Sequence, residues 1–86
     1  MSEIRMVIDQ LNAAAARVDE VAGLLHSAGN RVDDMRQSLF RVLADSQAPE
    51  VGHAHQVTAH TAELVTTATH ALHEAAALAR HRAASL

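Results

Sequence analysis

Histidine is the residue type in this chain with the clearest chemical potential, because imidazole binds metals and exchanges protons near neutral pH. Seven His occur among the 86 residues. Three of them, His53, His60 and His81, share one column of a helix because their spacings are multiples of seven residues. Seven residues of helix rise about 10 Å, which is too far for two side chains to share one ion. The remaining four are His26, His55, His70 and His73.

Two local spacings bring a second possible ligand close to a His. His70 and His73 lie one helical turn apart, but their order matches neither of the helical zinc motifs H-E-x-x-H and H-x-x-E-H. Glu50 and His53 have the Glu-x-x-His spacing of di-iron bundles, yet they follow Pro49 at the start of a helical segment. We therefore expect no metal site and no cofactor, with a metal-binding ferritin-like bundle as a remote alternative.

The sequence also lacks a nucleophile in a catalytic setting. It has no Cys, and its Ser and Thr residues fall mostly in helical patterns. Activated nucleophiles need an oriented base and oxyanion donors, which two plain helices do not supply. We expect no catalytic residue, and we predict that the protein is not an enzyme.

Charge and composition argue against nucleic-acid binding. The formal charge is −3, all seven basic residues are Arg, and they are dispersed along the chain. A phosphate backbone is normally followed by a basic stripe, and bases are stacked on aromatic rings. Phe40 is the only aromatic residue. The sequence therefore predicts no nucleic-acid partner.

The first half of the chain carries a heptad pattern, which predicts one helix over about residues 2–44. The pattern runs through Gly29 and Asn30 without interruption. Three neighbouring columns are mostly apolar, which is typical of a helix that touches more than one neighbour. Column a is Ile4, Leu11, Val18, Leu25, Val32 and Leu39; column d is Val7, Ala14, Val21, Ala28, Met35 and Val42; column e includes Ile8, Ala15, Ala22, Gly29 and Leu43.

A turn over about residues 45–49 separates this helix from a second one over about 50–83. Pro49 suits the first turn of a helix, where its missing N–H costs nothing. Ser46 is the expected N-cap, and Glu50 lies near the positive end of the helix dipole. The predicted apolar seam is Ala54, Val57, Thr61, Leu64, Ala68, Ala71, Ala75 and Leu78, flanked by Val65, Leu72 and Ala79.

The expected fold is therefore all-α, a single domain over residues 1–86 in which two long helices form an antiparallel hairpin. Two helices cannot enclose three apolar columns, so we expect the hairpin to dimerise into a four-helix bundle with a second copy or a paralogous hairpin. The predicted function is that of a helical, coiled-coil-like protein–protein interaction module. The expected interface residues are Ile4, Val7, Leu11, Val18, Val21, Leu25, Val32, Met35, Leu39, Val42, Leu64, Val65, Leu72 and Leu78.

In length, in the midpoint turn and in its two apolar-seamed helices, the chain resembles the WXG100/ESAT-6-like small helical-hairpin proteins. The family's Trp-x-Gly turn would fall near Asp45–Ala48, where this sequence has no Trp. The resemblance implies a hairpin that pairs with another hairpin and leaves the cell without a cleaved leader. It makes a leaderless secreted hairpin, or a chaperone-like partner of a toxin, the alternative function.

The start of the sequence has no basic region followed by an apolar run, and no stretch approaches the roughly 20 apolar residues of a membrane span. We expect no membrane span and a cytoplasmic location, with secretion without a cleaved signal peptide as the alternative. A further hypothesis concerns pH. If His53, His60 and His81 are partly desolvated in an assembly, their protonation in acid would weaken it.

Overall fold

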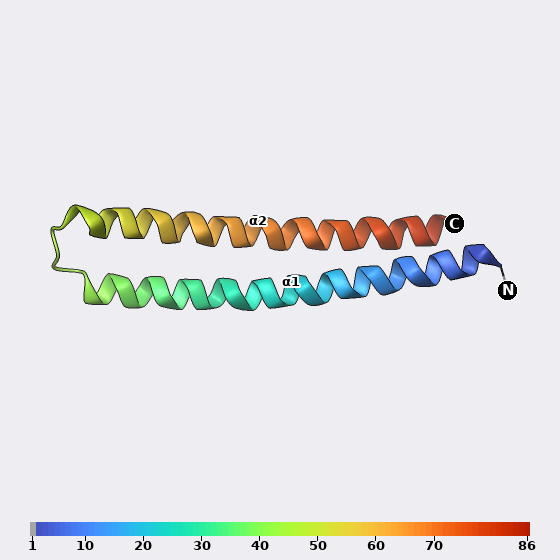
Figure 1. Ribbon diagram of the computed structural model, residues 1–86, viewed down its shortest axis with the longest axis horizontal. Helices are drawn as coiled ribbons and strands as arrows, with labels where there is room; N and C mark the ends of the chain where they lie inside the picture. Colours follow the sequence, from blue (N-terminus) through green and yellow to red (C-terminus); the bar gives the residue numbers. More distant parts are fainter. Residues whose placement is uncertain (1) are drawn as a thin grey trace.

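The computed structural model describes residues 2–86 and confirms an all-helical hairpin. Helix α1 spans Glu3–Val42 and helix α2 spans Pro49–Ser85, and the described residues contain no strand. The two helices lie side by side and run in opposite directions, so that the start of α1 and the end of α2 lie at the same end of the molecule and the turn lies at the far end (Figure 1). The molecule is a rod of 68 × 15 × 13 Å.

Helix α1 is continuous over its full length. Ser2 is its N-cap, and its hydroxyl oxygen accepts a hydrogen bond from the backbone N–H of Arg5 at 3.2 Å. This satisfies one of the free donors at the start of the helix. The helix passes through Gly29 and Asn30 and ends at Val42, slightly before the predicted end near residue 44.

The turn between the helices begins at Leu43, about two residues before the predicted start. Pro49 lies in the first turn of α2, as predicted, and is its first residue, one position before the predicted start near residue 50. The expected N-cap was wrong: Ala48 occupies that position and makes no side-chain cap. The hydroxyl of Ser46 instead accepts a hydrogen bond from the N–H of Ala48 at 3.3 Å, inside the turn. No residue of the described chain, 2–86, has a positive φ, so the reversal is built from ordinary backbone conformations.

The seam between α1 and α2 differs from the one that the sequence pattern suggested. On α1 the half-buried and buried positions follow columns a and e, while column d stays exposed. On α2 the predicted seam is largely exposed, and α1 is met instead by two other columns. These are Val51, Thr58, Val65, Leu72 and Ala79, and His55, Ala62, Thr69, Ala76 and Ala83.

Small side chains explain this choice. Column e brings Ala15, Ala22 and Gly29 to the seam, and an ideal Cβ on Gly29 would lie only 3.2 Å from Cγ1 of Val65. Small residues let two helix backbones approach closely, so that many weak dispersion contacts add up along the rod. The core of the hairpin consequently holds little volume. Its buried residues are Ala15, Ala22, Thr69, Ala76 and Ala83.

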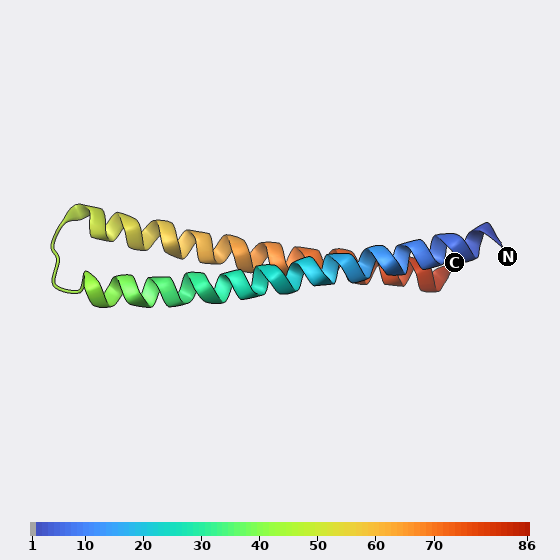
Figure 2. The ribbon, with the colours of Figure 1, turned by 60° about the horizontal axis from the view of Figure 1, so that its bottom comes forward.

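The helices wind slowly around each other, as the second view shows (Figure 2). A repeat of seven residues falls slightly short of two full turns, so a strict heptad seam requires this twist. Because the alternating three- and four-residue steps persist from Ile8 to Leu43, each flanking column keeps its side of the rod throughout. Within residues 2–86, neither helix has a stretch long and apolar enough to cross a membrane.

Candidate interaction surface

The hairpin has two broad sides with different chemistry, one on each side of the seam. On α1, the column containing Asp19, His26 and Asp33 flanks the seam on one side, and column d flanks it on the other. Asp19 contacts His73 and Arg80 of α2, which places those residues on the same side of the rod as Asp19. We call this side the polar face. The opposite side is therefore formed by column d of α1 and by the α2 column of Ala54, Thr61, Ala68 and Ala75.

An ion cluster joins the helices on the polar face. Arg80 Nη1 donates to Asp19 Oδ2 at 2.6 Å, and Nδ1 of His73 lies 3.1 Å from Oδ1 of the same carboxylate. The hydrogen bond from Arg80, and then that from His73, lowers the pKa of Asp19 below its ordinary value. The side chain of Asp19 is 33% exposed, so water screens these interactions. The cluster aligns the two helices, and its contribution to stability is small.

This cluster makes acid stability depend on Asp19. Because the folded-state pKa is lowered, the stabilisation is complete at neutral pH and disappears as the pH falls below 3.8 through the folded-state value. We expect Asp19→Asn to lower the free energy of unfolding at pH 7 and to have an effect that diminishes as the pH falls below 3.8. Urea unfolding across this range measures it. Asp34→Asn, on the exposed outer side of α1, is the control; an equal pH dependence in both variants would contradict the assignment.

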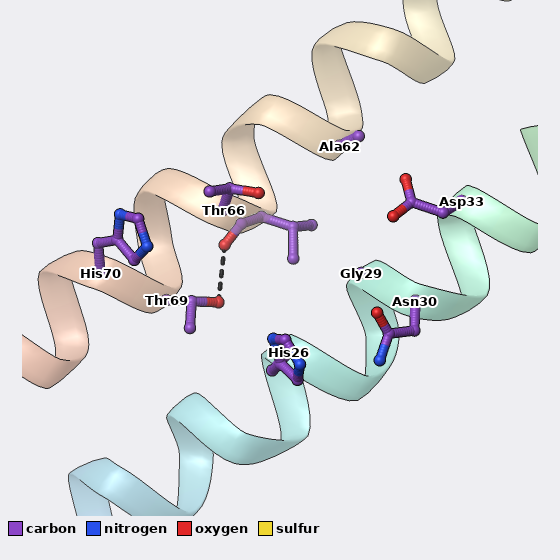
Figure 3. A pocket seen from close by; sticks show the side chains of 9 residues that line it. His26, Gly29, Asn30, Asp33, Ala62, Thr66, Thr69 and His70 are labelled. Atoms are coloured by element: carbon purple, nitrogen blue, oxygen red, sulfur yellow. Dashed lines mark hydrogen bonds between the residues drawn. The ribbon is translucent and has the colours of Figure 1, made fainter.

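A shallow cavity of about 230 Å³ lies between the helices next to the seam, with side chains from both around it (Figure 3). His26 and Asp33 come from α1, and Thr69 and His70 from α2. The hydroxyl of Thr69 donates to the carbonyl oxygen of Val65 in its own helix at 2.8 Å, so it is not directed at a ligand. Among the described residues, no three His, Asp or Glu side chains gather closely enough to hold a metal ion.

The His and Glu residues considered above as metal ligands or pH-sensitive groups lie at separate places in the structure. His53, His60 and His81 are exposed on the side of α2 opposite the seam, away from both broad sides of the hairpin. Glu50 and His53 are exposed in the first turn of α2, where no partner carboxylate from α1 joins them among the residues described. The arrangement brings none of these side chains together into one site.

His55, like His73, has a structural role that the sequence did not predict. The ring of His55 stacks on Phe40 with ring centroids 3.9 Å apart and an interplanar angle of 9°. This pair joins the helices near the turn. In the described chain, Nδ1 of His55 and Nε of Arg36 are buried without a hydrogen-bond partner. The stack fixes the turn end of the hairpin, as the Asp19 cluster fixes the other half.

The side opposite the polar face is almost entirely apolar and exposed, and we call it the apolar face. Its large side chains keep between 43% (Val7) and 80% (Val42) of their surface exposed. Leu24, at the outer edge, is 68% exposed. From α1 the face contains Val7, Ala14, Val21, Leu24, Ala28, Met35 and Val42; from α2 it contains Ala54, Val57, Thr61, Leu64, Ala68, Ala71, Ala75 and Leu78.

The predicted interface residues divide between the seam and this face. Column a faces α2 from Leu11 onward, while Ile4 at the start of α1 is 55% exposed. Val65 and Leu72 also lie in the seam, whereas the other two predicted α2 residues lie on the apolar face with column d. The seam members are Leu11, Val18, Leu25, Val32, Leu39, Val65 and Leu72, and the exposed members are Ile4, Val7, Val21, Met35, Val42, Leu64 and Leu78.

Comparisons of the chain with protein-family models, with curated proteins and with solved structures found no match.

Proposed function

We propose that this chain is a non-enzymatic helical interaction module that acts by pairing with a second helical hairpin. The strongest support is the small size of the hydrophobic core that the hairpin forms on its own. Among the described residues, only Ala and Thr side chains are buried, and no large side chain is fully buried. Stability comes mainly from apolar area removed from water, and Ala contributes little of it.

The exposed area points the same way. The hairpin exposes 6445 Å², whereas a compact globular protein of 9.2 kDa exposes about 4900 Å². The excess of about 1500 Å² reflects the elongated shape of the rod. One broad side of this rod exposes large apolar side chains. Pairing two hairpins into a four-helix bundle is the usual way to cover such a surface. The partner would be a second copy or a paralogous hairpin.

Sedimentation velocity on the purified chain, across micromolar concentrations, tests the proposal. We expect a species of twice the chain mass, and helix content that falls on dilution as the assembly dissociates. A chain that stays monomeric and fully helical at high micromolar concentration would refute self-assembly. A chain that is largely unfolded alone, and gains helix only with a paralogous hairpin, would identify a hetero-pair.

A further inference from the structure

The α1 half of the apolar face has side-chain sizes that complement those of a second, antiparallel α1. Column d alternates between larger and smaller side chains along most of α1. When column d of one copy lies antiparallel to column d of a second copy, Ala14 is opposite Met35 and Val21 is opposite Ala28. A small side chain then faces a larger one at both places. Val7 then meets Val42 at the ends. The midpoint of this pairing lies beside Leu24, the exposed leucine at the edge of the face.

The part on α2 has a midpoint of its own. Its outer column contains Leu64 and Leu78, which are 55% and 62% exposed, with Ala71 halfway between them. A reversed copy places Leu64 of one chain against Leu78 of the other. It also brings Ala68 and Ala75 together, where two small residues permit close approach of the helices.

The two midpoints lie at the same level of the rod. Gly29 and Val65 are directly opposite each other, because a Cβ on Gly29 would touch Val65. Antiparallel helices rise equally per residue, and from this contact toward the chain ends Leu24 is five residues away on α1 and Ala71 six residues away on α2, a difference of about 1.5 Å along the rod. A single two-fold axis, perpendicular to the rod, can therefore pass through the midpoint on α1 and the midpoint on α2 and produce both sets of pairs.

We propose that the occupant of the apolar face is a second copy of this chain, laid face to face and head to tail, with α1 against α1 and α2 against α2. This inference rests on the proposed function and specifies its partner and geometry. In such a two-fold interface residue i contacts residue j and residue j contacts residue i, as the paired columns require. The turns lie at opposite ends of the assembly, and Leu24 lies at the axis beside Leu24 of the other copy.

Area and charge are compatible with this arrangement. If the interface covered an area equal to this excess, about 1500 Å² on each copy, it would bury about 3000 Å² in total, which is within the range of obligate homodimers. Column d and its α2 counterparts carry no charge except Arg82 at the end of α2. The arrangement brings Arg17 of one copy near Arg31 of the other at the exposed edge, where water and salt limit the repulsion.

Cysteine cross-linking tests the register, since the chain contains no Cys of its own. In the double variant Val21→Cys/Ala28→Cys, each new thiol faces its complement on the other copy, and we expect a disulfide-linked dimer on oxidation. Within one chain the two thiols are about 10 Å apart along α1, too far to bridge. Each single variant should stay unlinked, because its two copies are separated by the same distance. Cross-linking of a single variant, or none of the double variant in a sample that sediments as a dimer, would overturn the inference.

A second measurement separates this inference from the proposed function. Leu24→Glu places two carboxylates at the axis and should raise the dimer dissociation constant at least about tenfold, with the seam untouched. Ser27→Glu, exposed on the outer side of α1, is the matched control and should leave it unchanged. A dimer that resists Leu24→Glu would overturn the geometry while the assembly function stands. A wild-type chain that is monomeric throughout would overturn this inference, and the proposed function would then stand only if a paralogous hairpin binds the chain.

Discussion

Leu25→Asp is expected to unfold the hairpin or to reduce its stability by several kcal/mol. Leu25 belongs to column a, is half-buried, and lies between buried Ala22 and the close contact of Gly29 with Val65. A carboxylate there would lose hydration among the small and apolar side chains of the seam. Circular dichroism during urea titration measures the loss as a lower midpoint or as loss of helix in water.

Asp33→Ala is the control for this variant, because Asp33 lies on the polar face beside an open cavity. Its removal should change the midpoint little, since exposed substitutions away from caps and ion pairs usually stay within about 0.5 kcal/mol. If Leu25→Asp unfolds at the same urea concentration as the wild type, column a does not face α2.

Ala22→Leu is expected to destabilise the hairpin by about 2 kcal/mol or more, although leucine is the more hydrophobic residue. Ala22 is 0% exposed at the centre of the seam, so a larger side chain must push the helices apart or adopt a strained rotamer. Urea unfolding, followed by circular dichroism, gives the difference in free energy.

The matched control is Ala13→Leu, on the exposed outer side of α1. Both changes add the same atoms to the same helix and differ little in helix propensity, so the difference between the variants isolates packing. Equal stability would contradict a seam built on column e and would favour the a and d seam of a simple coiled coil.

The sequence predicted the two helices well, because their signals are local. The heptad repeat and the position of Pro49 predict the bounds of both helices and of the turn to within a few residues. The N-cap was predicted wrongly because Ser46 has the right chemistry but lies too early, and its hydroxyl is used within the turn. Cap geometry depends on backbone angles that residue type alone does not determine.

Which columns face each other was much harder to predict. Three adjacent columns of α1 are mostly apolar, and periodicity does not say which pair of them meets α2 and which remains for a partner. The choice depends on how closely the backbones approach at Ala22 and Gly29, a property of both helices together. The Asp19 cluster was missed for a related reason, because His73 is 54 positions away in sequence and no local pattern links them.

The turn has a consequence for how the sequence can vary. Residues 43–48 reverse the chain with φ angles that every L-amino acid adopts, and none of the described residues needs the left-handed region. No position of this turn therefore requires glycine, and residues other than proline meet no penalty there from the left-handed region. The steric demands of the hairpin fall instead on the small residues of the long seam, where Ala22 and Gly29 leave no room for larger side chains.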